Sequence, residues 1–502
     1  MAMDILVSAV VSDLISRSAS FLIKKCSQQP DADKNLQRLS RLLLRAHAIV
    51  EEAEGRRITN QAMLWQLKML TEGFYRGHFM LDIFKFRALP GGSTEDEEEA
   101  SHSSAMSKIH PAKRVRSSST NTKMMLSGGN SATELHEMAD FLETIIADMK
   151  EFVVFLGSYP RMNRQPYCTY LFLDNCMFGR QMERERVLSF LLHPEAAPGS
   201  ENLAVLPIVG PQRVGKSTLV EHVCRDEMVR DHFSMILFFR ENSLNDAGVT
   251  DLRESGLVKH QNSHASQKRL LIVIELAGDI DEETWKRVIY STSRKARGSK
   301  IIITSRSKKI TKFGTVETLW LDLLPPEVYW HFFKTLAFGT ANPDEQPKLA
   351  SMTMEIATEQ RQCFVSGYIV ARLLRDNLDA RFWRAVLRCV RAYKRKHLLL
   401  FDEHPNVRMR RDEPVYYWRL GGSGRYFLIC DYYQTDSCRE DVAEVTVQDV
   451  LLGRDAPRGR FEALGWTSRL PPYYNYMISC VSQESGSGVG RMKRKALDLS
   501  GV

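Results

Sequence analysis

The stretch LPIVGPQRVGKSTLV, Leu206–Val220, contains Gly210, four further residues and then Gly215-Lys216-Ser217, which is the spacing of a phosphate-binding loop. A short apolar run, 203–209, precedes the loop, and residues 218–228 have a helical pattern after it. A strand, a glycine-containing loop and a helix in this order favour phosphate binding over a chance match on a structural turn. The stretch therefore predicts a P-loop α/β domain.

Each part of this loop has a physical role. The glycines permit the tight backbone path, and the amides up to Thr218 point at phosphate oxygens, helped by the helix N-terminus. We expect Lys216 to reach the β-phosphate (and the γ-phosphate, if present) and Ser217 to ligate Mg²⁺. Pro207 conflicts with this assignment because it removes one hydrogen-bond donor from a central strand. The loop residues predicted to bind nucleotide are Gly210, Pro211, Gln212, Arg213, Val214, Gly215, Lys216, Ser217 and Thr218.

Three further apolar runs, 234–239, 269–274 and 300–304, have the spacing of a parallel α/β sheet. The second run is followed by Glu275, which we expect to serve the metal directly or through water. In most such proteins another carboxylate comes next and activates water, but here that position is Leu276. Slow or absent hydrolysis follows, and Leu276→Asp is expected to raise turnover if the backbone aims the side chain at the γ-phosphate. Asp279 is either an alternative base or a loop or cap residue.

The first 155 residues predict helices, because four segments repeat apolar residues at intervals of three and four. An antiparallel four-helix bundle buries all four apolar faces. Residues of about 90–130 are rich in Ser, Gly and charge and predict a disordered loop. The apolar positions are Val7, Val10, Val11, Leu14 and Phe21; Leu36, Leu39, Leu43, Ala46 and Val50; Met63, Leu67, Leu70 and Phe74; and Leu135, Met138, Leu142, Ile145, Met149 and Phe152.

The composition favours an intracellular globular protein. Of 502 residues, 43% are hydrophobic and 26% are charged, and no apolar run approaches the roughly 18 residues of a membrane span. Asp4 stands where a signal peptide would carry basic residues. The nine cysteines include no C-x-x-C pair, which favours reduced thiols over disulfides or a zinc site. The net charge of +8 is mild for this length and does not by itself indicate nucleic acid.

The last part of the chain predicts a basic helix and then strands. Arginines repeat at three and four residues opposite an apolar face, so the helix is amphipathic. Its basic face fits an anionic membrane or an acidic partner, or is simply solvated. Runs 414–434, 442–453 and 472–482 are β-rich, and the first predicts a hairpin. The arginines are Arg381, Arg384, Arg388, Arg391 and Arg395, opposite Trp383, Val386, Val390 and Tyr393.

Four ordered motifs give a more specific identification. MFGRQ (Met177–Gln181), the P-loop, GSKIIITSRS (Gly298–Ser307) and LDLLPPEVYWHFFKTLAFG (Leu321–Gly339) together resemble the NB-ARC domain of plant intracellular immune receptors. The N-terminal bundle, with YRGHFMLDIF (Tyr75–Phe84), resembles their Rx-type coiled-coil domain.

The resemblance implies several binding residues. Phe178, Gly179 and Arg180 should border the adenine, Arg306 should sense the terminal phosphate, and the ligands should be ADP or ATP with Mg²⁺. The chain also departs from the family. Where the family has paired aspartates, this chain has Glu275 and Leu276. Of the acidic motif of the coiled-coil domain, only Asp82 matches. A proline-containing segment is replaced near 363–374, and neither a winged helix nor leucine-rich repeats are found, which indicates a truncated or diverged receptor.

We therefore expect five parts: an Rx-like bundle at 1–155, a linker with the entry motif at 156–200, a P-loop domain at 201–340, a helical ARC1-like subdomain at 341–400 and a β-rich module at 401–502. The expected function is an ADP- or ATP-binding switch in plant defence with weak or no hydrolysis. An active ATPase and a nucleotide-free scaffold or decoy are the alternatives. A Ras-like GTPase is disfavoured because no Asn-Lys-x-Asp motif occurs.

Partners should be proteins that contact the bundle, through self-association or another immune receptor, and not nucleic acid. The sequence leaves open whether the protein also contacts a membrane. The expected location is the cytoplasm, with nuclear or plasma-membrane association as alternatives.

Overall fold

The computed structural model describes residues 30–87, 131–161, 177–192, 203–240, 257–261, 269–293, 298–411, 413–418, 425–436, 445–454, 459–470 and 473–484. The first predicted helix and the predicted loop at about 90–130 lie outside these residues. The chain divides into two compact units. We call them the helical unit, with residues up to 170 and 326–358, and the sheet unit, with residues 171–325 and from 359 onward.

The helical unit contains three of the four predicted bundle helices. Their apolar stripes are buried as expected; for example, Leu39, Leu43 and Leu142 are fully buried. Gly77 sits where the helices approach closely, because a Cβ atom there would lie 2.8 Å from the Leu43 side chain. The elements are α2 (Pro30–Glu54), α3 (Gln61–Arg87), α5 (Ser131–Ala147), α6 (Lys150–Leu156), α14 (Pro326–Phe338), η2 (Pro343–Glu345) and α15 (Pro347–Glu359).

Helix α14 packs on α3 within this unit. The Trp330 indole donates a hydrogen bond of 2.9 Å to the buried Asp82 carboxylate, and Lys334 forms an ion pair with the same group. Lys85 pairs with Asp344 at 2.6 Å. Of the acidic motif expected in the bundle, Asp82 is thus the residue that joins two helices distant in the sequence.

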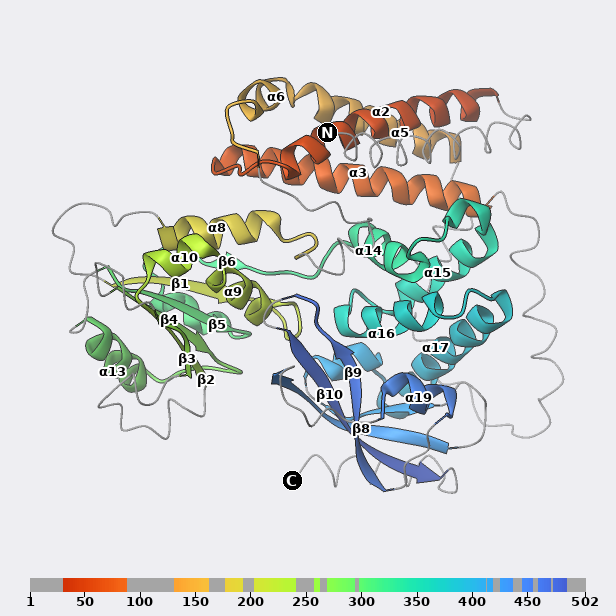
Figure 1. The fold of residues 1–502 in the computed structure, drawn as a ribbon. Coiled ribbons are helices and arrows are strands. Elements are labelled where there is room, and N and C mark those ends of the chain that lie inside the picture. The colour runs from red at the N-terminus through yellow and green to blue at the C-terminus, as the bar shows by residue number, and fades with distance from the viewer. Residues whose placement is uncertain are drawn as a thin grey trace. The chain divides into compact units, whose positions relative to one another are not determined.

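The sheet unit is built on six strands in the order β3-β2-β4-β5-β1-β6 (Figure 1). The strands are parallel except β3, which runs antiparallel to β2 at one edge. The three predicted strands are confirmed, whereas β3 was not anticipated. The strands are β1 (Ala204–Val209), β2 (Met235–Arg240), β3 (Leu257–Gln261), β4 (Leu270–Glu275), β5 (Lys300–Ser305) and β6 (Leu319–Trp320).

Helices cover both faces of this sheet, giving three layers. One face packs on α8 (Gln181–Leu192), α9 (Lys216–Cys224) and α10 (Glu227–His232). The other packs on α13 (Glu282–Ser293) and η1 (Lys308–Phe313). Because side chains alternate along a strand, β4 sends Leu271 and Val273 to the first face and Ile272 and Ile274 to the second. The P-loop α/β domain predicted from the sequence is confirmed.

Pro207 is accommodated because β1 is only partly covered on its outer side. β6 pairs with Ile208 and Val209 alone, so Pro207 has no ladder partner there. Its ring lies against Gly314, where a Cβ atom would come within 2.6 Å of the proline side chain. A proline is tolerated in β1 because β6 does not extend as far as Pro207, so no ladder hydrogen bond from an N–H is missing there.

The rest of the sheet unit is a helical extension followed by a four-stranded antiparallel sheet in the order β7-β8-β10-β9 (Figure 1). The predicted hairpin forms β7 and β8, and the run 472–482 forms most of β10. The prediction of a strand at 442–453 was wrong, because Thr446 caps a short helix there. The elements are α16 (Phe364–Arg375), α17 (Ala380–Phe401), α18 (Pro405–Met409), β7 (Val415–Trp418), β8 (Arg425–Asp436), α19 (Val447–Leu452), β9 (Arg460–Thr467) and β10 (Tyr474–Glu484).

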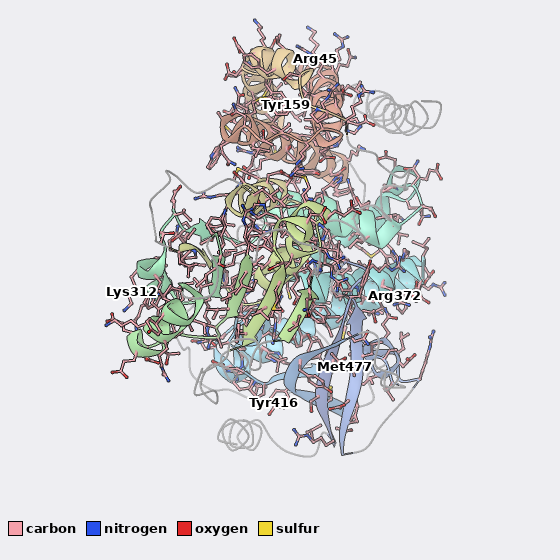
Figure 2. The ribbon with its side chains drawn as sticks, turned by 60° about the vertical axis from the view of Figure 1, so that its left-hand side comes forward. Arg45, Tyr159, Lys312, Arg372, Tyr416 and Met477 are labelled. Atoms are coloured by element: carbon pink, nitrogen blue, oxygen red, sulfur yellow. The ribbon has the colours of Figure 1, made fainter. Side chains whose placement is uncertain are left out.

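A buried histidine fastens the antiparallel sheet to α17. His397 is fully buried; its Nδ1 lies 2.9 Å from the Tyr393 carbonyl, and its Nε2 accepts a hydrogen bond of 3.1 Å from the amide of Tyr416. Figure 2 labels Tyr416 on β7 and Met477 on β10. No helix in the described part of the chain is both long and apolar enough to cross a membrane.

Candidate phosphate-binding site

The loop between β1 and α9 has the backbone that the sequence predicted. Gly215 has a φ of 96°, in the left-handed region that favours glycine, and it precedes the first turn of α9. Gly210 is confined for another reason. A Cβ atom there would lie 2.3 Å from the carbonyl oxygen of Leu321, just after β6. The loop is therefore held against the backbone that follows β6.

Lys216 is folded back onto its own loop. Its ammonium group donates hydrogen bonds to the carbonyls of Gly210 (2.8 Å) and Pro211 (2.9 Å). Burial lowers the pKa of Lys216 to about 8, with Arg306 acting in the same direction and Glu275 opposing it. The partly desolvated cation gains from any anion that enters the loop.

Glu275 stands at the carboxyl end of β4, next to β5 and close to the loop after β1. Parallel strands present their carboxyl ends at one edge, where α/β proteins bind ligands. The Oε1 atom of Glu275 is buried and takes no hydrogen bond from any described residue. A buried carboxylate oxygen without a donor suits a cation or its water ligand, so the donor set of Ser217 and Glu275 fits Mg²⁺.

Leu276 points away from this site. It is 6% exposed and belongs to the core on the α13 face, together with Ile274 and Trp285. A side chain in this position is not aimed at the phosphate side of the sheet. The expected rise in turnover for Leu276→Asp required a backbone that aims this side chain at the γ-phosphate, and the backbone does not do so.

Asp279 behaves as a loop residue. It pairs with Lys309 on η1 at 2.6 Å and is substantially exposed. Its hydrogen bonds with Lys309 and Ser307 lower its pKa. A carboxylate held in this way is a weak proton acceptor near neutral pH.

Two of the predicted arginines reach the loop in different ways. Arg306, just after β5, donates a hydrogen bond of 3.3 Å to the Gln212 side chain, so it lies beside the P-loop. Arg180 is 5% exposed and donates to the carbonyls of Val214 (3.5 Å) and Asp322. The role of Arg306 at a terminal phosphate stays a prediction, whereas Arg180 ties the entry segment to the loop.

The other predicted residues form the surroundings of this site. Phe178 and Gly179 lie in the turn before α8, and Gly179 has a φ of 68°. Ser217 and Thr218 occupy the first turn of α9 and are half-buried. The place of Phe178 and Gly179 beside the adenine remains a prediction.

Two features of the site were not predicted from the sequence. The carbonyls of Leu321 and Asp322 shape the loop, and no residue type signals a backbone contact of this kind. The second is a hydrogen bond of 2.5 Å from the Tyr474 hydroxyl on β10 to Glu221 on α9. A polar residue, Glu221, inside a buried helix was the signal available, because buried carboxylates need partners.

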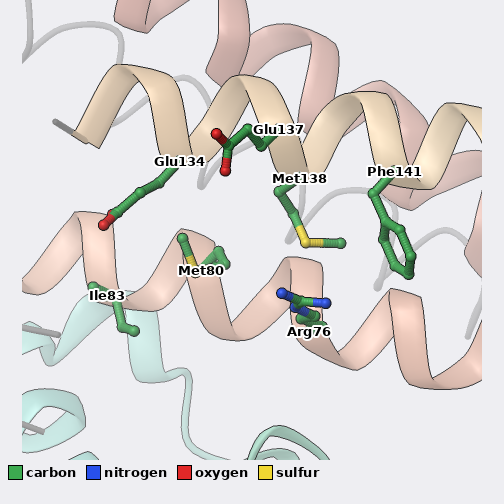
Figure 3. A pocket seen from close by; sticks show the side chains of 7 residues that line it. All are labelled: Arg76, Met80, Ile83, Glu134, Glu137, Met138 and Phe141. Carbon is green, nitrogen blue, oxygen red and sulfur yellow. The ribbon is translucent and has the colours of Figure 1, made fainter. Parts of the chain in front are cut away.

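The helical unit has a hollow of its own. It has a volume of about 270 Å³ and lies between α3 and α5 (Figure 3). Arg76, Glu134 and Glu137 contribute its charged groups, while Met138 and Phe141 are among its apolar ones. Among the described residues no cluster of three His, Cys, Asp or Glu side chains is placed to hold a metal ion.

Comparison with known families agrees with the two resemblances seen in the sequence. Residues 10–116 match the sequence model of the Rx N-terminal domain, and residues 180–342 match that of the NB-ARC domain. The second match begins at Arg180, includes the whole six-stranded sheet and ends after α14.

Curated relatives are plant disease-resistance proteins. Disease resistance protein RGA2 of Solanum bulbocastanum is 21% identical over 75% of this chain and 38% of its own length. Putative disease resistance protein RGA1 of the same species is 21% identical over 70% and 35%, respectively. Disease resistance RPP13-like protein 4 of Arabidopsis thaliana is 23% identical over 70% and 42%. The matches thus span well under half of each relative.

A solved structure also matches over part of the chain. A chain in the structure of Drosophila ORC bound to DNA covers 49% of this chain and 68% of its own, with 12% identity and a TM-score of 0.26.

Proposed function

Because the chain belongs to the plant coiled-coil NB-ARC disease-resistance proteins, we propose that it is an ADP- or ATP-binding switch that acts in plant defence. Its P-loop would hold the phosphates, Lys216 would neutralise their charge, and Ser217 and Glu275 would hold Mg²⁺. When bound, Mg²⁺ supplies charge neutralisation on the phosphate oxygens. Arg306 would sense whether a terminal phosphate is present.

The observation that carries this proposal is the convergence of charged groups at one sheet edge. Lys216 is partly desolvated, and the charges of Glu275 and Arg306 act on its pKa. Among the described residues, its ammonium donates hydrogen bonds only to carbonyl oxygens of its own loop. Those two bonds are ones that a phosphate can replace.

Weak hydrolysis is part of the proposal. Phosphoryl transfer to water needs an oriented nucleophile, and a carboxylate normally contributes to this. Leu276 faces the opposite core and Asp279 is engaged by Lys309. Without general-base assistance the rate falls by about 10²–10⁴. Exchange of ADP for ATP, rather than chemistry, would then set the signalling state.

The test measures retained nucleotide. Protein purified from cells is heat-denatured, and the released nucleotide is quantified for the unmutated chain, for Lys216→Ala and for Lys309→Ala as a control. We expect adenine nucleotide from the unmutated chain and the control but a large loss from Lys216→Ala, because a charge-assisted bond worth roughly 1.5–3 kcal/mol is removed. Equal nucleotide content in all three proteins would contradict the assignment of the site.

A second part of the proposal concerns partners. We propose that the helical unit contacts other proteins, including further copies or another immune receptor, in the cytoplasm. Its surface carries large apolar side chains: Trp65 and Met69 on α3 and Phe141 on α5 are 57%, 54% and 41% exposed. Exposed apolar groups of this size that are close together mark protein contact sites. Cross-linking of the full chain with and without Trp65→Ser tests this assignment.

A further inference from the structure

Helix α17 of the sheet unit carries an unusual surface. Arg381, Arg384, Arg388 and Arg395 are all exposed, and none forms a hydrogen bond or ion pair with a described residue. Arg391, between them, is half-buried. We call the four exposed arginines the arginine row. The opposite face of the helix is buried through Trp383 and Val386, so the orientation of α17 is fixed and the row cannot turn inward.

Among the described residues, none of the four exposed arginines has the acidic partner expected on a solvated helix face. Solvated helices mix charges of both signs. On α2, for example, Arg38 pairs with both Asp140 and Glu143. The sequence of α17, residues 380–401, contains no Asp or Glu. Like charges three and four residues apart repel each other, and cations near a helix N-terminus oppose its dipole. The row therefore costs stability in the absence of an anionic partner.

The geometry of the row fits a flat surface. The four arginines follow one another at three, four and seven residues, so they drift only slightly around the helix and form a nearly straight line. From Arg381 to Arg395 the line is about 21 Å long. Every guanidinium in such a line can contact the same plane at once.

Apolar residues favour lipid over nucleic acid. Leu399, four residues after Arg395 on the same side of the helix, is 72% exposed, and Leu378, three residues before Arg381, is 43% exposed. Leucines beside a basic row can enter the boundary between lipid headgroups and acyl chains. Proteins that bind single-stranded nucleic acid use exposed aromatic rings for stacking. On α17, every aromatic ring is buried or half-buried.

We propose that the arginine row is a docking surface for an anionic phospholipid bilayer. Because the apolar face of α17 is used inside the protein, the helix does not insert. Binding is peripheral and mainly electrostatic, and it weakens as salt is added. The two leucines at the ends of the row add a small contribution that salt does not remove.

Flotation of the full chain with lipid vesicles tests this proposal. Vesicles of phosphatidylcholine alone are compared with phosphatidylcholine that contains one quarter phosphatidylserine. The test variant is Arg384→Glu/Arg388→Glu. The matched control is Arg41→Glu/Arg45→Glu, which reverses an equal charge at the same spacing on exposed arginines of α2. Figure 2 labels Arg45 at the surface of the bundle.

We expect binding to the phosphatidylserine vesicles only. The α17 variant should lose at least about tenfold in partitioning, because each arginine near such a surface contributes substantially, whereas the α2 control should lose much less. Leu399→Ser should weaken the binding that remains at high salt. Arg384→Gln/Arg388→Gln, with an unchanged melting temperature, gives the same answer if charge reversal prevents folding.

Other outcomes would overturn the proposal. An equal loss in the α17 and α2 variants would mean that only net charge matters. Binding to phosphatidylcholine alone would exclude an electrostatic surface. Retention on single- or double-stranded DNA in the same buffer, with no flotation, would assign the row to nucleic acid instead.

Discussion

Asp82 on α3 and Lys334 on α14 form an ion pair inside the helical unit, although 252 positions separate them in the sequence. Their side chains are 10% and 16% exposed. The carboxylate also accepts the hydrogen bond from Trp330. One residue belongs to the Rx N-terminal match and the other to the NB-ARC match, so the pair joins segments of two families within one compact unit.

Asp82→Asn should destabilise the helical unit strongly. It leaves the ammonium of Lys334 buried without its counter-charge, and breaking a buried pair in this way typically costs about 3–5 kcal/mol. Asp344→Asn is the control, because its pair with Lys85 is more exposed and should matter by about 1 kcal/mol or less. Urea unfolding followed by circular dichroism measures both. A similar loss of unfolding free energy in the two variants would show that burial of the Asp82 pair adds nothing to stability.

Acid should weaken the same unit through His78. Burial, and then the nearby Lys334, lower the pKa of His78 to about 3. Between pH 6.5 and 3 the unfolded chain binds a proton that the folded chain does not, so the stability is fully present above pH 6.5 and falls as the pH decreases. Asp82 does not contribute within most of this window, because Lys334 and Lys85, against the effect of burial, hold its pKa below the usual value.

The measurement compares unfolding free energies at pH 7 and pH 5. We expect a loss of about 1–2 kcal/mol from His78, and a smaller pH dependence in His78→Gln. His136→Gln, at an exposed position on α5, is the control for the loss of an imidazole from this unit. A pH dependence that survives in His78→Gln would point to His331, whose pKa is also well below its usual value because of burial.

The extent to which the sequence predicts this structure depends on the range of each interaction. The P-loop, the three core strands and three of the four bundle stripes follow from local spacing and are found, whereas the first stripe lies outside the described residues. Helix α19 was mistaken for a strand because its apolar residues are too few to show a period, and Thr446 decides the structure by capping. The contact of Tyr474 with Glu221 spans 253 positions, and the direction of the Leu276 side chain depends on the packing of the whole sheet. Glu221 in a buried helix indicates that a partner is needed but not which residue supplies it, and no local spacing identifies Tyr474.

Gly210→Ala should disrupt the P-loop, although the change adds only a methyl group. The new carbon would lie 2.3 Å from the Leu321 carbonyl oxygen, and the backbone must move to relieve this contact. We expect a loss of roughly 1–3 kcal/mol in stability and a clear loss of nucleotide binding, measured by calorimetry. Gly278→Ala is the matched control, because nothing lies within 4 Å of a Cβ atom there. Normal binding by Gly210→Ala would refute the confinement of the loop by Leu321.

Tyr474→Phe should loosen the attachment of the antiparallel sheet to α9. It removes the hydroxyl that donates to the buried Glu221 carboxylate, a hydrogen bond to a charged group worth about 1.5–3 kcal/mol. Tyr473→Phe is the control: Tyr473 is 45% exposed, and its ring, which Arg225 contacts, is retained. Glu221 lies one helical turn after Ser217, so nucleotide dissociation should also accelerate in Tyr474→Phe. Unchanged dissociation, with reduced stability, would restrict the hydrogen bond to a structural role.

Leu276→Asp should not create an ATPase. A carboxylate in this position would enter the core formed by Ile274, Trp285 and Ile310 rather than the phosphate side of β4. Replacing the buried leucine and burying an unpaired charge should cost about 3–5 kcal/mol. Leu276→Met, which nearly conserves volume, should cost less than about 1.5 kcal/mol.

Phosphate release under multiple-turnover conditions and thermal melting are measured for both variants and for the unmutated chain. We expect little turnover in any of them and a low melting temperature only for Leu276→Asp. A rise in turnover by Leu276→Asp that disappears when Lys216→Ala is added would mean that position 276 can reach the γ-phosphate after all. Robust turnover by the unmutated chain would direct attention to Asp279, whose pairing with Lys309 would then have to open during the reaction.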